Sequence, residues 1–345
     1  MKDFDRLLVR YRQFGGWRLV CQYARMGVLG TASAALVRCI LSGRSPKEVY
    51  PAITRKVDDV LACRYRHILD AYADSADCPV GEDGASCEVP RIIWSAWLQG
   101  VGRAPEMVQA CLRSQREHLP GYDVRVLDMD NYRQWVDLPE DIIRKYRKGL
   151  IPPASFSDLL RLAALKKYGG VWMDATVYCT GFADERLRTR WQHIMQSRLT
   201  LFRYFRKGVA QPVGLSTWFV AAVPGQRHVA AVLDMLLAYW RDYDCLVDYY
   251  IIHLFLGMSL RRFPEEAGRM PRENSFHSLL LGRSLAKDFD AADWNELVAH
   301  VSLHKLNYRK AAEAGRNKNG YYRHLLHLRG ATPCGSISTY NQHDV

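Results

Sequence analysis

A chain of 345 residues in which 48% are apolar and 24% are charged has enough hydrophobic material for a large core, and this excludes disorder over most of its length. Its 48 Lys and Arg residues exceed its 36 Asp and Glu residues, and the net charge of +12 favours an anionic partner such as a phosphorylated substrate, a nucleic acid or an anionic membrane surface. No zinc-finger, RRM-like or KH-like signature is present, so a nucleic-acid partner is not expected.

Cysteine usage and the start of the chain bear on the cellular compartment. The nine cysteines are odd in number, scattered, and never spaced as C-x-x-C, which indicates free thiols in a reducing compartment rather than a disulfide framework or a zinc site. Cys78 and Cys87 flank a loop-like segment and are a pair that oxidation could join. Asp3 and Asp5 stand in the first turns without a clean apolar core after them, so the N-terminus does not resemble a secretory signal. We therefore expect a cytoplasmic protein.

Residues 1–75 are predicted to form a helical N-terminal region in which arginines alternate with apolar and aromatic residues. The most apolar stretch, residues 27–37, is ended by Arg38 and is too short to span a bilayer. Two interpretations stay open for this region: a basic interfacial helix that lies on anionic lipid, or an ordinary helical cap with solvated arginines. The first interpretation would make the protein peripheral at the inner face of the cell membrane.

An α/β pattern follows residues 76–90, whose Asp, Ser, Gly and Pro content predicts a linker. Because strands alternate with helices beyond it, we expect a mostly parallel sheet with helices on both faces, in one α/β domain over residues 91–310. Residues 311–345 are polar and are predicted to form a C-terminal tail. The predicted strands span residues 91–98, 122–127, 171–177 and 217–223. The predicted helices span residues 105–115, 131–135, 140–148, 155–168 and 226–239.

The segment from Ser157 to Thr180 carries the clearest chemical pattern. Asp158 and Arg161 are three residues apart, so they share a face of the predicted helix. A Gly-Gly turn then leads into a strand, and Asp174 stands at the carboxyl end of that strand, where open α/β sheets bind ligands. A carboxylate there, followed by the hydroxyl of Thr176, suits Mg²⁺ or Mn²⁺ beside a diphosphate.

Each of these residues also has an ordinary structural interpretation. Asp158 and Arg161 would form a surface ion pair of little energetic value, and Asp174 would cap a turn. The joint arrangement, rather than any one residue, favours a functional site.

The pattern S-D-x-L-R, followed by Y-G-G-x-W-x-D-A-T, resembles the bacterial capsular polysaccharide synthesis glycosyltransferases. These belong with the glycosyltransferases named for a short D-x-D motif (family 32), and they are distantly similar to the glucosylating domain of large clostridial toxins. The similarity covers roughly residues 90–310 in three blocks. The blocks are residues 92–100, residues 157–180, and a third that runs from 217–219 through 248–250 and His253 to 304–306.

The resemblance implies a Rossmann-like GT-A fold and an enzyme that transfers a sugar from a nucleoside-diphosphate sugar, expected to be a UDP-sugar, to a glycan or lipid-linked glycan acceptor. The process would be the synthesis of capsular or other surface polysaccharide, with retention of the anomeric configuration. A metal ion, Mn²⁺ or Mg²⁺, would neutralise the charge that develops on the departing diphosphate.

The same resemblance gives roles to individual residues. Trp97 would stack on the nucleotide base, although either Trp97 or Trp94, which lies on the opposite face of the strand, is expected to be a core residue. Asp158 would bind the ribose or the sugar, and Arg161 would bind the sugar or the phosphates. Asp174 would be the first carboxylate of the motif, a catalytic residue that holds the metal.

One departure from the motif concerns its second acid, which is Thr176 here. A hydroxyl is a weak ligand beside a carboxylate. His304 is therefore expected either to contact the phosphates or complete a metal sphere with Asp174 and Thr176, or to be a partly buried, hydrogen-bonded histidine. Lys305 would balance the charge of the diphosphate.

The third block adds two candidates. Asp248 is expected to be a catalytic carboxylate on the acceptor side. His253 stands five residues later and would be poorly aligned with Asp248 on a helix. It either faces the cleft or packs in the core.

Two other functions stay open. The missing second acid is compatible with a basic membrane-surface or nucleic-acid-binding module that keeps a degenerate nucleotide-binding fold. A toxin-like transferase that acts on a host protein is the weaker alternative, because no secretion signal is evident. Release of nucleoside diphosphate from a sugar nucleotide would separate an enzyme from a binding module.

Overall fold

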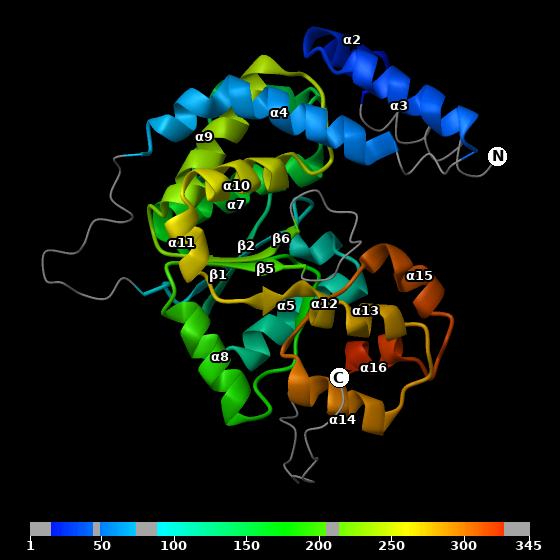
Figure 1. Cartoon of the computed structure of the whole chain (residues 1–345). Coiled ribbons are helices and arrows are strands. Elements are labelled where there is room, and N and C mark those ends of the chain that lie inside the picture. Colours follow the sequence, from blue (N-terminus) through cyan, green and yellow to red (C-terminus); the bar gives the residue numbers. More distant parts are fainter. Residues whose placement is uncertain (1–14, 44–48, 74–87, 205–213, 328–345) are drawn as a thin grey trace, which may run out of the picture.

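The computed structural model describes residues 15–43, 49–73, 88–204 and 214–327, which form an α/β fold with an N-terminal helical region (Figure 1). Most of the predicted linker, residues 76–90, lies outside the described residues, and so do Cys78 and Cys87. The six cysteines recorded within the described residues are free thiols.

Six strands form the main sheet, in the order β2-β1-β3-β6-β5-β7. They are β1 (Ile92–Ala96), β2 (Asp123–Leu127), β3 (Gly170–Met173), β5 (Leu199–Arg203), β6 (Leu215–Ala222) and β7 (Glu273–Asn274). Three of the five pairings are parallel, and β6 runs antiparallel to both β3 and β5. The predicted mostly parallel sheet is confirmed. β6 is its exception: it follows β5 in the chain, and an antiparallel neighbour can be reached without a crossover helix.

Helices cover both faces of this sheet, as the alternation of elements predicted (Figure 1). One face carries α4 (Val49–Asp70), α7 (Pro153–Tyr168), α9 (Arg227–Asp242) and α10 (Ile251–Arg262), and the other carries α5 (Glu106–His118) and α8 (Glu185–Met195). The other helices are α6 (Glu140–Arg147), α11 (Pro264–Arg269), α12 (Ser275–Ser278), α13 (Leu280–Ser284) and α14 (Ala291–His300), with the 3₁₀ helices η2 (Val101–Arg103), η3 (Tyr132–Gln134) and η4 (Tyr308–Lys310).

Strand periodicity divides the core between the two faces of the sheet. Trp94 of β1 and Trp172 of β3 are buried in the cluster under α7, α9 and α10. Their neighbours Ile93 and Val171 are buried in the cluster under α8. Such strands are apolar at most positions because both of their faces are covered.

The predicted N-terminal helical region consists, in the described residues, of α2 (Trp17–Arg25), α3 (Leu29–Leu41) and α4. α4 lies across α9 and α10, whereas α2 and α3 stand at one end of it, away from the sheet (Figure 1). Within the described residues no single helix is long and apolar enough to cross a membrane, and α2 and α3 meet that criterion only together, as a pair bent by 116°.

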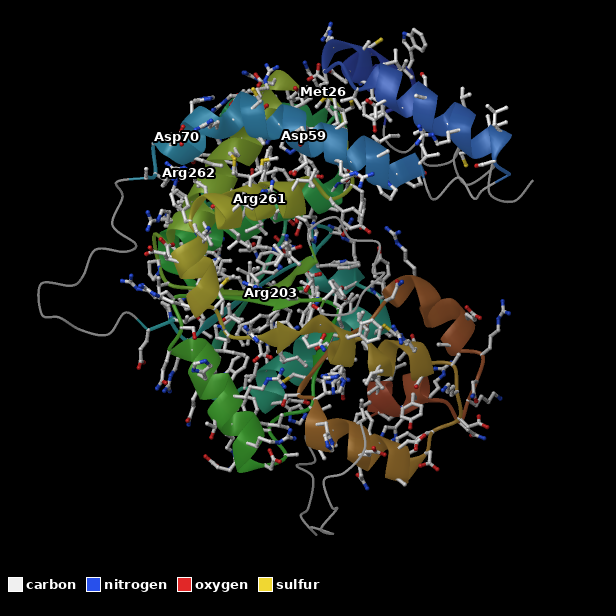
Figure 2. All side chains as sticks on the ribbon, in the orientation of Figure 1. Met26, Asp59, Asp70, Arg203, Arg261 and Arg262 are labelled. Atoms are coloured by element: carbon white, nitrogen blue, oxygen red, sulfur yellow. The ribbon has the colours of Figure 1, made fainter. Side chains whose placement is uncertain are left out.

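Ion pairs fasten α4 to α10. Arg261 lies 2.9 Å from Asp58, and Arg262 lies 3.1 Å from Asp70. Figure 2 shows Arg262 beside Asp70 at the end of α4. The helical region is thus joined to the α/β body by charge as well as by apolar packing.

Two short strands bring the end of the chain to the main sheet. β4 (Val177–Cys179) pairs antiparallel with β8 (Leu303–Lys305), and Val177 stands opposite Lys305. This pairing places the last block of the sequence pattern beside the residues that follow β3.

Residues 311–327 belong to the folded body. It forms α15 (Ala311–Ala314) and α16 (Tyr321–His327), and α16 packs on α5. The aromatic residues Tyr321 and Tyr322 are buried in this contact. The domain therefore continues beyond the predicted boundary at residue 310, because α16 completes a hydrophobic cluster on α5.

Candidate functional site

A glycine turn sets the direction of β3. Gly169 and Gly170 have φ angles of 64° and 99°, which residues with side chains rarely adopt. A Cβ atom at Gly170 would stand 2.6 Å from the carbonyl oxygen of Ile92, so β3 can approach β1 closely only with glycine there. The turn ends α7 and leads the chain into β3, which places Asp174 directly after the carboxyl end of the strand.

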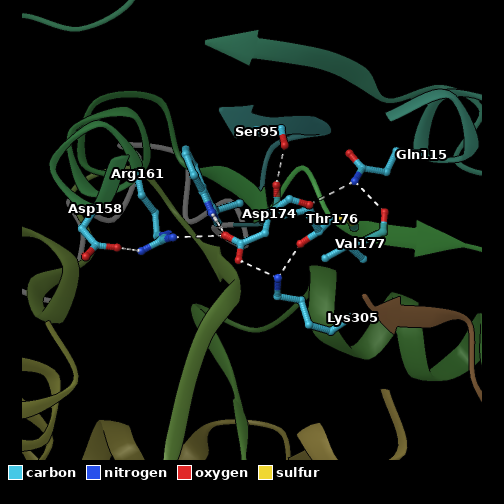
Figure 3. Close-up of polar contacts among 10 residues, drawn as sticks. Ser95, Gln115, Asp158, Arg161, Asp174, Thr176, Val177 and Lys305 are labelled. Carbon is cyan, nitrogen blue, oxygen red and sulfur yellow. Dashed lines mark hydrogen bonds and ion pairs between the residues drawn. The ribbon is translucent and has the colours of Figure 1, made fainter. Parts of the chain in front are cut away.

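The Asp174 carboxylate receives three donors from different parts of the chain (Figure 3). Arg161 Nη2 donates to Oδ1 at 3.1 Å, and Trp172 Nε1 donates to the same oxygen at 3.0 Å. Lys305 Nζ lies 3.3 Å from Oδ2. The Arg161 guanidinium also lies over the Trp172 ring, 4.8 Å from its centroid. Side chains from α7, β3 and β8 therefore meet at one carboxylate.

Arg161 is shared between two carboxylates. It pairs with Asp158, on the helix face that their spacing predicted, and with Asp174. Burial would raise the pKa of Asp174, but the positive charges of Lys305 and Arg161 outweigh it and hold that pKa below its usual value. Burial raises the pKa of Asp158 to about 6 in spite of Arg161, and the negative charge of Asp174 adds to the increase.

Lys305 is the fourth member of a cluster of charges that also contains Asp158, Arg161 and Asp174. Its Nζ donates to Thr176 Oγ1 and approaches Asp174 Oδ2 at 3.3 Å (Figure 3). Backbone pairing fixes this position, because the N–H of Leu306 donates to the Thr176 carbonyl at 2.9 Å. Gln115 holds the same loop from α5, and its Nε2 donates at 2.9 Å to a carbonyl at the start of β4. The loop after β3 is thus tied on two sides.

The side chains around Asp174 do not offer the ligands that a divalent cation needs. Asp174 is the one carboxylate of the D-A-T segment, and Arg161 and Lys305 already pair with it. Thr176 offers a hydroxyl that accepts from Lys305. Across the described ranges no group of three or more His, Cys, Asp or Glu side chains is placed to hold a metal ion. Mg²⁺ and Mn²⁺ favour several oxygen ligands, carboxylates above all.

His304 is not brought to Asp174. The histidine is fully buried, and its Nε2 lies 3.2 Å from Thr180 Oγ1. Successive residues of a strand point to opposite faces, so Lys305 faces the cluster and His304 faces away from it. Burial lowers the pKa of His304 to about 3, although a backbone bond to Val301 favours the charged form. The contact with Thr180 is that of the hydrogen-bonded histidine of the sequence interpretations, but its burial is complete rather than partial.

The two tryptophans of the first block differ in burial. One of them was expected to be a core residue. Trp94 is fully buried and its Nε1 donates to the Gly169 carbonyl at 2.9 Å, so it is the core residue. Trp97 is half-buried and packs with Ala175, the residue that follows Asp174. Its ring meets Tyr308 edge to face, with 5.3 Å between centroids. The sequence did not single out Tyr308.

Asp248 lies elsewhere. Its Oδ2 accepts from Thr54 Oγ1 of α4 at 2.6 Å, and its Oδ1 accepts from the backbone N–H of Tyr250 at 2.7 Å. Burial raises the pKa of Asp248, although both hydrogen bonds oppose the increase. The structure thus gives this carboxylate an anchoring contact between α4 and the start of α10, and does not bring it together with Asp174.

His253 lies closer to the cluster of charges than Asp248 does. Burial and, to a lesser extent, the charge of Arg161 lower the pKa of His253 to about 3, and Asp174 acts in the opposite direction. The ring is half-buried and meets Tyr250 edge to face. The His253 ring thus lies within reach of the charges of Arg161 and Asp174.

Three supporting residues were missed by the sequence analysis: Trp172, Gln115 and Ser95, whose Oγ donates to the Met173 carbonyl at 2.7 Å. Trp172 had a detectable signal, because residues two apart along a strand share a face and Asp174 follows it at that spacing. Gln115 and Ser95 act across tertiary contacts that no local pattern announces.

Comparisons with known proteins now bear on this site. The sequence model of the capsular polysaccharide synthesis protein family matches residues 43–325. No curated protein matches the chain. Among solved structures, the chain is similar to the PaToxG glycosyltransferase at 12% sequence identity and a TM-score of 0.36, over 82% of this chain and 98% of that one. That likeness is too distant to bear on function. The family match covers most of the chain, confirms the resemblance drawn from the sequence, and shows that the chain belongs to the capsular polysaccharide synthesis protein family.

Proposed function

We propose that the protein is a glycosyltransferase that moves a sugar from a nucleoside-diphosphate sugar to a glycan acceptor during the synthesis of surface polysaccharide. The observation that carries the proposal is the cluster of Asp158, Arg161, Asp174 and Lys305 at the carboxyl end of β3. Family membership supports the same conclusion, since the family is one of capsular polysaccharide synthesis. A nucleotide site at this edge of an α/β sheet has a general physical basis.

The residues divide the chemistry between them. Negative charge develops on the diphosphate as the sugar leaves, and fixed cations aimed at that charge lower the barrier. Lys305 and Arg161 are the cations, and Asp174 holds both in place. Asp158, directly beside Arg161, is available to hydroxyl groups of the ribose or the sugar. Trp97 lies beside Ala175 and offers a half-exposed ring to the base.

The finer assignments belong to the same proposal. We take a UDP-sugar as the donor, a glycan or lipid-linked glycan as the acceptor, and retention of the anomeric configuration as the outcome. The inner face of the cell membrane is the place where a basic protein and a lipid-linked acceptor would meet.

A panel of sugar nucleotides tests the proposal. Purified protein is incubated with each nucleotide, and both binding and release of free nucleoside diphosphate are measured. We expect one nucleotide class to bind and to be turned over when a glycan acceptor is supplied. Binding without turnover under every acceptor condition would favour a module with a degenerate nucleotide-binding fold. Failure of every nucleotide to bind would refute the proposal.

A further inference from the structure

The ammonium group of Lys305 lies between the two side chains that a D-x-D motif would use together. Asp174 stands at the first acidic position and Thr176 at the second. Lys305 Nζ is 3.3 Å from Asp174 Oδ2 and donates to Thr176 Oγ1 (Figure 3). Lys305 therefore contacts the position that a cation would share between two motif side chains.

Asp174 and Lys305 together have the same net charge as two motif carboxylates with a divalent metal ion would have. Two carboxylates with a divalent cation have no net charge, and neither do one carboxylate and one ammonium. Asp174 already pairs with Arg161 at 3.1 Å and with Lys305 at 3.3 Å. A divalent cation placed on Asp174 would meet the repulsion of both cations at short range.

Lys305 also has the geometry that binding requires. An ammonium has three N–H donors, and Asp174 and Thr176 take two of them. The Lys305 side chain is 23% exposed, and its third donor is left for a ligand by these two contacts. The antiparallel pairing of β8 with β4 keeps the lysine at this position before any ligand arrives.

We infer that Lys305 takes the place of the divalent metal ion, so that its ammonium, held by Asp174 and Thr176, is the fixed cation that binds the donor diphosphate. The inference rests on the proposed function and replaces the metal ion that the D-x-D resemblance implied. It predicts that nucleotide binding needs no Mn²⁺ or Mg²⁺.

Calorimetry on the full chain tests this directly. UDP is titrated with EDTA present and again with Mn²⁺ or Mg²⁺ present, and GDP and ADP serve as further probes. We expect the dissociation constants with and without metal to agree within about twofold, and Lys305→Met to weaken binding about tenfold or more in both conditions. Lys145→Met is the matched control, since Lys145 of α6 is 22% exposed and pairs with Asp244 at 2.8 Å. This control should bind UDP like the wild type.

A second variant reverses the exchange. Lys305→Met combined with Thr176→Asp recreates two carboxylates without the lysine. Titration of Mn²⁺ alone should show binding to this double variant and none to the wild type. Addition of Mn²⁺ should then restore part of the UDP affinity that Lys305→Met loses.

The outcomes separate the inference from the proposed function. Wild-type protein that binds a nucleoside diphosphate only with metal would overturn the role of Lys305 and leave the transferase proposal standing. The same conclusion would follow if folded Lys305→Met bound UDP as well as the Lys145→Met control. Absence of nucleoside diphosphate binding in both conditions would overturn both. The wild-type comparison needs no variant to fold.

Discussion

Asp174 is the residue on which the cluster of charges depends, because one carboxylate orients Arg161, Lys305 and the Trp172 indole. Asp174→Asn keeps the shape of the side chain and removes its charge. We expect transfer to fall about a hundredfold or more, since both cations lose the charge that positions them. The protein should stay folded, with an unchanged near-UV circular dichroism spectrum.

The control for Asp174→Asn is Asp244→Asn, which also removes a carboxylate paired with a lysine, in this case Lys145. Its turnover should equal that of the wild type. Normal turnover by a folded Asp174→Asn protein would remove Asp174 from the site.

Asp158 should leave a signature in the pH dependence of stability. Its pKa in the folded protein is about 6, above the usual carboxyl value, so the folded state binds this proton more tightly than the unfolded state does. The resulting stabilisation is complete below a pH of about 4 and is lost as the pH rises through about 6. Relative to Asp158→Asn, the wild-type free energy of unfolding should fall by about 2 kcal/mol between about pH 4 and pH 7. Urea denaturation of both proteins across this range measures the difference.

A wild-type free energy of unfolding that rises with pH, relative to that of Asp158→Asn, would contradict the raised pKa of Asp158. It would mean that the ion pair with Arg161 dominates over burial.

The tryptophans of the first block allow a paired test of base stacking. Trp97→Ala should weaken UDP binding by about 1–3 kcal/mol, the range of stacking between a base and an aromatic ring. Trp94→Ala is the control, because Trp94 is fully buried and hydrogen-bonded to Gly169. It should lower the free energy of unfolding by about 3–5 kcal/mol. If Trp97→Ala changes only the melting temperature, Trp97 is a packing residue.

At the scale of elements, the sequence predicted what local patterns encode. α7, the Gly-Gly turn and Asp174 lie in one short segment, so helix spacing and turn chemistry were sufficient to place them together. β3 was predicted to continue to residue 177, but it ends at Met173. The reason is that the next residues turn, with the Val177 N–H donating to the Asp174 carbonyl at 2.9 Å, before β4 begins.

β4 and β8 show why the remainder of the site could not be predicted from the sequence. Each has three residues, too few for periodicity to identify, and their pairing joins distant parts of the chain. The face on which Lys305 and His304 point depends on this register, and a shift by one residue would exchange them. The sequence therefore marked both residues as candidates but could not choose between them.

The contact between Asp248 and Thr54 joins α4 to the loop before α10. Asp248→Ala should lower the free energy of unfolding by about 1–3 kcal/mol, because Thr54 loses a buried partner, and should leave turnover unchanged. Thr54→Ala completes a double-mutant cycle, in which the two losses should be less than additive. A change in the KM for acceptor at full stability would instead restore Asp248 to the acceptor side.

At the scale of the whole molecule, a chain with a net charge of +12 has basic and exposed apolar side chains together on its N-terminal helices α2 and α3. Five of the seven large hydrophobic side chains exposed in the described residues lie on α2 and α3: Trp17, Leu29, Val37, Ile40 and Leu41. Residues 15–43 also carry three arginines and no acidic residue. A surface that is both apolar and basic is complementary to an anionic membrane. Of the two sequence interpretations, we therefore propose the interfacial helix rather than the solvated cap.

We expect the full-length protein to sediment with phosphatidylcholine vesicles that contain phosphatidylserine. Changing Arg18, Arg25 and Arg38 to Gln should weaken this binding on the order of a hundredfold, since each basic residue near an anionic surface contributes about 1 kcal/mol. Changing Trp17, Ile40 and Leu41 to Ser should weaken it as well, because these exposed side chains would enter the headgroup region.

A control with the same loss of charge separates a local surface from net charge. Arg144, Arg147 and Lys148 lie exposed on and after α6, and changing all three to Gln lowers the net charge as much as the arginine changes on α2 and α3 do. If the α2–α3 surface is the docking site, the α6 variant binds vesicles like the wild type, and added salt weakens the binding of both. Equal losses in the two basic variants would mean that net charge alone attracts the protein to lipid. Full binding by both the Arg and the apolar variants of α2 and α3 would return these helices to the role of a solvated cap.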